Sequence, residues 1–147
     1  MSSAPPATAA RSRRPDTQTA VTTGGSARVI VLAWLIPGAG HVLVGEARRG
    51  LVFFVTLTAM YAIGIGFGGR LFPFQFSEWL VLLAGLAQWG LGLPRLIASI
   101  AGAGAGEVVA VTYEYGNTFL IASGLLNMLV ALDAFDRARG VKDRTTR

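Results

Sequence analysis

Four apolar stretches, separated by short polar or glycine-rich connections, dominate the middle of the chain. Each is about as long as the ~20 residues that a helix needs to cross a hydrocarbon core of about 30 Å. The pattern therefore predicts an all-α integral membrane protein with four transmembrane helices. The predicted spans lie at about residues 28–45, 51–69, 78–94 and 118–137.

Glycine and proline residues occur within these spans. We expect six of them to break helices or to form packing faces: Pro37, Gly38, Gly40, Gly64, Gly68 and Pro94. A proline removes a backbone hydrogen bond and kinks the helix, and small residues let two membrane helices approach closely. Gly64 and Gly68 have the small-x-x-x-small spacing of such a packing face. A half-helix substrate site at Pro37 is the alternative.

The ends of the chain differ in composition from its centre. Residues 1–25 are mainly Ala, Ser, Thr, Pro and Gly with three arginines, too little apolar content to fold, so we expect a disordered cytoplasmic tail. A twin-arginine signal and an organellar transit peptide are the alternatives for this segment. Residues 26–140 form the predicted transmembrane domain, and residues 141–147 a basic C-terminal tail.

Composition agrees with a membrane location. Of the 147 residues 52% are hydrophobic and 14% are charged, whereas soluble domains average about 25% charged residues. The chain has no cysteine, which excludes disulfides, thiolate metal sites and thiol catalysis. The net charge of +5 comes from basic residues that flank apolar stretches, so membrane topology explains it and we expect no nucleic-acid partner.

The distribution of lysine and arginine predicts an orientation. With four spans and an internal N-terminus, ten of the 13 basic residues lie on the inner side. If the first stretch were a re-entrant hairpin, the split would be seven to six. Positive residues collect on the cytoplasmic side, so we predict four spans in a bacterial cytoplasmic (inner) membrane with both termini in the cytoplasm.

Several motifs resemble those of a family of uncharacterised small bacterial multi-spanning membrane proteins, a domain of unknown function. They are Trp34-x-x-Pro37-Gly38-x-Gly40-His41, Thr112-Tyr-Glu-Tyr-Gly-Asn-Thr-Phe119, Gly124-Leu-Leu-Asn127 and Leu132-Asp-Ala-x-Asp136. The first half is also distantly similar to the two-helix transmembrane domain, although Val42-Leu43-Val44 replaces the aromatic residues expected after the histidine. These resemblances imply a membrane location and a helical fold, and no chemistry.

Polar residues within membrane spans are costly and often functional. The candidates are His41, Gln88, Asn127 and Asp133, together with Glu114 and Asn117 just before the last span. The predicted topology puts His41 near the outer end of span one and Asp133 near the inner end of span four, too far apart for a relay. We therefore predict that His41 bonds to the Glu114–Asn117 segment. At the inner end of the last span, Asp133 and Arg137, four residues apart, and Asp136 and Arg139, three apart, can pair. Arg28 and Arg70 are the alternative partners of Asp133 on the inner face.

This set holds no catalytic triad, metal site, phosphate-binding loop or cofactor motif. The favoured function is a non-enzymatic scaffold or accessory subunit of a membrane complex. A small oligomeric transporter or channel component is the alternative, and an enzyme using His41 and Glu114 is the least favoured. Expected partners are membrane lipids and either another membrane protein or further copies of the chain.

Overall fold

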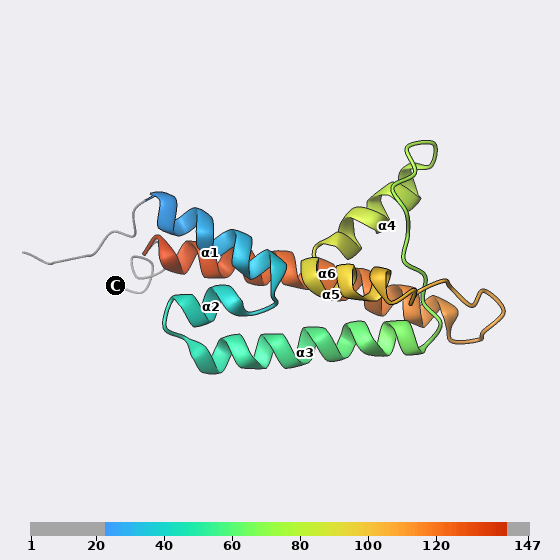
Figure 1. Cartoon of the computed structure of the whole chain (residues 1–147), viewed down its shortest axis with the longest axis horizontal. Coiled ribbons are helices and arrows are strands. Elements are labelled where there is room, and N and C mark those ends of the chain that lie inside the picture. Colours follow the sequence, from blue (N-terminus) through green and yellow to red (C-terminus); the bar gives the residue numbers. More distant parts are fainter. Residues whose placement is uncertain (1–22, 141–147) are drawn as a thin grey trace, which may run out of the picture.

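The structure, a computed structural model, describes residues 23–140, with side chains from residue 27 onward. These residues form helices and turns, and the one β-bridge among them joins Arg70 to Ala105. The helices are α1 (Thr23–Leu35), α2 (Ala39–Leu43), α3 (Ala47–Gly66), α4 (Trp79–Trp89), α5 (Gly92–Ile100) and α6 (Tyr113–Ala138) (Figure 1). The all-helical fold class is confirmed, and α1 begins three residues before the predicted boundary. The rest of the two predicted tails lies outside the described residues.

The long helices α3 and α6 run side by side in opposite directions and carry the other elements (Figure 1). At 1.5 Å per residue they are about 30 Å and 39 Å long. Close approach is possible because Gly64 packs against Leu120, where a methyl group would collide. Both helices are long and apolar enough to cross a membrane, and α4 with α5 would add a third crossing if that bent pair is one span.

The predicted first span is not one helix. Helix α1 ends at Leu35, and the chain reverses through the buried Pro37 and through Gly38, which adopts a positive φ of 77°. A side chain at Gly38 would also overlap the backbone of Gly50 on α3. The short α2 therefore returns toward the end of the molecule at which α1 begins (Figure 1).

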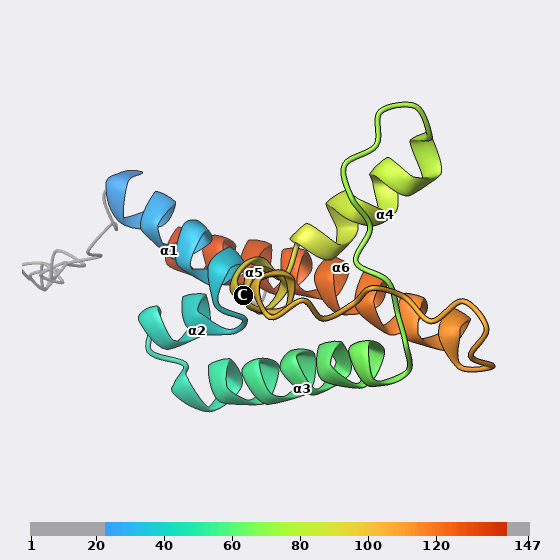
Figure 2. The ribbon, with the colours of Figure 1, turned by 45° about the vertical axis from the view of Figure 1, so that its right-hand side comes forward.

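The predicted third span also breaks. Helix α4 ends at Trp89, and α5 leaves it at an angle of 108°. The break consists of Gly90 and Leu91, so Pro94 lies in the first turn of α5, where a missing N–H costs little. Helix α4 projects away from the body (Figure 2), while α5 packs on the α3–α6 pair, where its Ala98 lies in a cluster with Leu57, Tyr61 and Leu120.

The other two predicted spans correspond to single helices with shifted ends. The second lies in α3, which ends at Gly66, so Gly68 stands in the following turn with a φ of 78°. Gly64 and Gly68 therefore do not form the predicted pair on one helix. The fourth lies in α6, which begins five residues before the predicted start.

Candidate functional site

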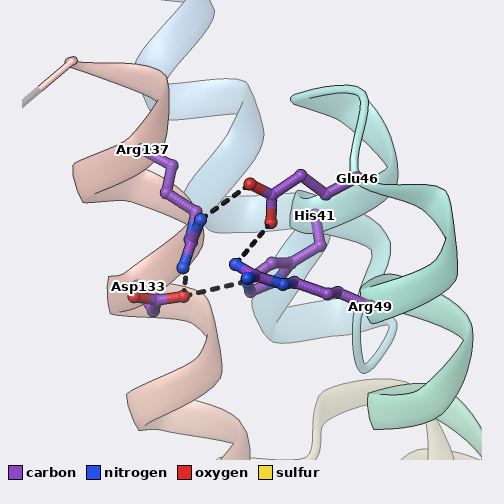
Figure 3. Close-up of polar contacts among 5 residues, drawn as sticks. All are labelled: His41, Glu46, Arg49, Asp133 and Arg137. Carbon is purple, nitrogen blue, oxygen red and sulfur yellow. Dashed lines mark hydrogen bonds and ion pairs between the residues drawn. The ribbon is translucent and has the colours of Figure 1, made fainter. Parts of the chain in front are cut away.

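An ion-pair cluster joins the start of α3, the short α2 and the end of α6 (Figure 3). Nε2 of His41 lies 3.0 Å from Oδ2 of Asp133. Arg137 donates to the same oxygen at 2.8 Å and to Glu46 at 2.7 Å, and Glu46 also accepts from Arg49 at 3.1 Å. The cluster thereby ties α2 and the start of α3, which are neighbours in sequence, to the remote C-terminal end of α6.

His41 is fully buried beneath this cluster, against the ring of Phe53 at a centroid distance of 5.0 Å. Because a carboxylate can only accept from the ring, Asp133 favours the tautomer with hydrogen on Nε2. Nδ1 of His41 is buried without a hydrogen-bond partner. The imidazole therefore acts here as a donor that anchors α2 to α6.

The prediction that His41 and Asp133 stand at opposite membrane faces is wrong. It assumed a continuous helix through Pro37, whereas the reversal there returns His41 to the end where α1 starts. The predicted bond of His41 to Glu114 or Asn117 is wrong for the same reason. Glu114 and Asp133 are 19 residues apart on α6, which corresponds to about 28 Å along the helix. The predicted Asp133–Arg137 pair is present.

Glu114 and Asn117 lie at the other end of α6. The Glu114 side chain is exposed, and its main-chain carbonyl accepts from the Thr118 hydroxyl at 2.9 Å. The Asn117 side chain is buried and accepts from the backbone N–H of Arg70 at 2.8 Å. Asn117 thus fastens the chain leaving α3 to the first turn of α6.

The second polar centre lies midway along α6, where the two helix breaks meet. Asn127 is fully buried, and its Nδ2 donates to the carbonyls of Trp34 at 3.1 Å, of Ala33 at 3.3 Å and of Gly90 at 2.8 Å. The Trp34 indole also donates to the Trp89 carbonyl at 2.9 Å. One amide therefore satisfies carbonyls that both breaks leave without intrahelical donors.

Gln88 and Arg95 extend this centre toward the α3–α4 connection. Gln88 is fully buried, donates to the Arg70 carbonyl at 2.8 Å and accepts from the Phe72 N–H at 3.0 Å. Arg95 is 7% exposed, donates to the Phe72 carbonyl at 2.8 Å and lies 5.3 Å from the Trp89 ring centroid. No carboxylate in residues 27–140 forms an ion pair with Arg95.

Arg95 is a buried polar residue of this centre that is not among the candidates predicted from the sequence. Its signal was its position directly after Pro94, between the apolar residues of the third stretch and Leu96-Ile97. The Glu46–Arg137 ion pair does not follow from the sequence either, because four complete spans put the turn that carries Glu46 on the opposite side of the membrane from Arg137. Within the part of the chain that the structure describes, no group of three His, Asp or Glu side chains could hold a metal ion.

Comparison with protein families identifies the chain at the level of the family. The sequence profile of a family of unknown function, DUF6677, matches residues 28–145. The chain belongs to this family. The match agrees with the resemblance that the motifs predicted, and it covers all six helices except the first residues of α1. Searches of curated proteins and of solved structures gave no match.

Proposed function

We propose that this DUF6677 protein is a non-enzymatic scaffold or accessory subunit of a membrane complex, held in the cytoplasmic membrane with both termini in the cytoplasm. In this proposal α3 and α6 cross the bilayer. Helices α1 and α2 form a hairpin that enters from the cytoplasmic side, and α4 and α5 form one that enters from the outer side. At about 20 Å and 17 Å, α1 and α4 are too short to cross a core of about 30 Å.

The distribution of charge supports this orientation. The exposed Arg70 lies at the end of the molecule where α3 ends. Five arginines lie at the other end, where α1 begins and α6 ends: Arg28, Arg48, Arg49, Arg137 and Arg139. The sequence adds three arginines before α1 and three basic residues after α6. With both termini in the cytoplasm, as proposed, 11 of the 13 basic residues of the sequence are cytoplasmic, a stronger asymmetry than four spans would give.

The scaffold assignment depends on one observation: the buried amides midway along α6 and on α4 bond to main-chain groups at and beside the helix breaks. Asn127 and Gln88 meet carbonyls and an N–H that the broken helices and the loop leave free. Non-helical backbone at membrane depth requires such partners. These polar side chains therefore have a structural task that accounts for their burial.

A small oligomeric transport or channel component is the second candidate, and a different observation favours it. The chain repeats one order of elements (a broken helix pair followed by a long helix), and the long helix of the second unit, α6, runs opposite to α3, the long helix of the first (Figure 1). Inverted repeats with broken helices that meet near the membrane centre are typical of transporters. Arg95, buried without a carboxylate partner, would then favour a small anion.

Affinity purification of the tagged full-length chain in mild detergent, followed by mass determination of the complex, tests the assignment. We expect a stoichiometric membrane-protein partner that remains bound through size-exclusion chromatography. A homo-oligomer without a partner that releases chloride from loaded liposomes would contradict the scaffold and support transport. The matched variant for the flux assay is Arg95→Gln, which should abolish such release if the second candidate is correct.

A further inference from the structure

An open depression of about 630 Å³ lies between the start of α3 and the end of α6. Its wall is formed by four charged and two apolar side chains: Arg48, Arg49, Asp133, Arg137, Val52 and Phe53. Three of these side chains, Arg49, Asp133 and Arg137, belong to the ion-pair cluster of Figure 3. The depression is open to the outside of the protein, so a ligand can enter it without a change in the fold.

The charges in this depression are not mutually neutralised. Glu46 and Asp133 engage Arg137 and Arg49, and these bonds hold both guanidinium groups in place. Arg48 is exposed and forms no hydrogen bond or ion pair with the described residues. Three arginines against two carboxylates leave an excess of positive charge, and its unpaired member is Arg48.

The apolar part of the wall continues along α3. Val52 is 61% exposed, and the next turn presents the exposed Val55 on the way toward the membrane centre. A ligand bound here would meet guanidinium groups at one end and an apolar helix surface at the other. Phospholipids with a net negative headgroup have this profile, and basic pockets between helices at the cytoplasmic face bind such headgroups.

We propose that this depression binds an anionic phospholipid, with the headgroup phosphate at Arg48 and Arg49 and an acyl chain along Val52 and Val55. Arginine suits the phosphate because its planar fork can donate two hydrogen bonds. The proposal depends on the membrane orientation given above. It does not depend on whether the protein is a scaffold or a transporter.

Native mass spectrometry of the purified, delipidated chain tests this site. The probes are phosphatidylglycerol, phosphatidylcholine of the same acyl length and inorganic phosphate. We expect phosphatidylglycerol to bind several-fold more tightly than phosphatidylcholine. Arg48→Gln should lower that preference about fivefold, as expected for one arginine near a lipid headgroup. Arg48→Lys should retain part of the preference, because the charge remains and the fork is lost.

Arg139→Gln is the matched control. Arg139 is exposed at the same end, but it stacks on Phe135 and does not line the depression. Equal binding of the two lipids, or an equal loss in Arg48→Gln and Arg139→Gln, would overturn the proposal. Saturable binding of phosphate alone, without a lipid preference, would also overturn it. The partner experiment is independent because lipid binding is measured on the isolated chain.

Discussion

The only histidine of the chain illustrates how one residue fixes the arrangement of helices. His41 is buried, and its partner, Asp133, is 92 residues away in sequence. A buried imidazole that lost this acceptor would leave an unsatisfied N–H in an apolar site, which costs about 1–3 kcal/mol. The pair therefore stabilises the reversed α2 against a straightened first helix.

Double-mutant cycles between His41→Ala and two acidic positions test this pairing. We expect a coupling free energy above about 0.5 kcal/mol for His41 with Asp133→Ala, because the side chains are in contact. His41 and Glu114→Ala should be additive within about 0.3–0.5 kcal/mol, because most of helix α6 separates them. The readout is reversible unfolding in detergent, and coupling of His41 to Glu114 in place of Asp133 would contradict the chain reversal at Pro37.

Asn127 has the larger structural task. Replacement by leucine keeps the number and branching of the side-chain heavy atoms but removes both N–H donors from the three carbonyls of Ala33, Trp34 and Gly90. We expect Asn127→Leu to lower the free energy of unfolding by about 1–3 kcal/mol, the cost of buried groups left without partners. Thr118→Val is the control, since its hydroxyl is exposed and bonds only to its own helix. An equal, small loss of unfolding free energy in both variants would contradict the role of Asn127 in bonding the carbonyls at the two helix breaks.

The sequence indicates which polar residues are unusual, but it does not indicate which groups they bond to. Gln88, Asn127 and Asp133 stand out because polar side chains are rare in apolar stretches. Apart from Arg137, their hydrogen-bond partners are main-chain groups or residues of other helices, and no sequence pattern indicates these once a helix reverses. The Asp133–Arg137 bond was predictable because it follows from helix geometry alone.

At the scale of elements, the two helix breaks depend on glycines that allow backbones to touch. Gly90 at the α4–α5 break faces Gly124 on α6, and a methyl group on either would overlap a main-chain carbonyl of the other segment or of Ala87. Backbones cannot move aside as a flexible side chain can. The break therefore requires small residues on both sides.

Gly124→Ala tests this packing. We expect the variant to lose the folded state or to express at a small fraction of the wild-type level, because α4 must move away from α6. Gly66→Ala is the matched control: it lies in the last turn of α3 with no atom within 4 Å of the added methyl group. Alanine there should be neutral or stabilising by up to about 1 kcal/mol. Normal folding of Gly124→Ala would contradict the close contact.

Hydrophobic pattern alone could not distinguish a span from a hairpin. Residues 28–45 contain enough apolar length to cross the bilayer once, and the same residues folded in two reach only part of the way. The deciding feature is the chain direction after Pro37, which depends on Gly38 taking a positive φ beside Gly50. The long helices α3 and α6 were predictable because no break interrupts them.

For the whole molecule, the proposed topology makes a prediction that cysteine labelling can check, since the chain has no native cysteine. Ala47, at the start of α3, and Phe76, in the connection before α4, are exposed. Two opposed hairpins place residue 47 in the cytoplasm and residue 76 outside. Four complete spans would instead place residue 47 outside and residue 76 in the cytoplasm. Val109, which is 92% exposed, lies outside in either arrangement.

We expect a membrane-impermeant maleimide to label Phe76→Cys and Val109→Cys in right-side-out vesicles, and to label Ala47→Cys only after the membrane is permeabilised. Val109→Cys shows that the orientation of the vesicles is correct. The opposite pattern at residues 47 and 76 would restore four spans and separate Glu46 from Arg137. Because that ion pair joins α3 to α6 at 2.7 Å, such a result would overturn the hairpins and the lipid site together.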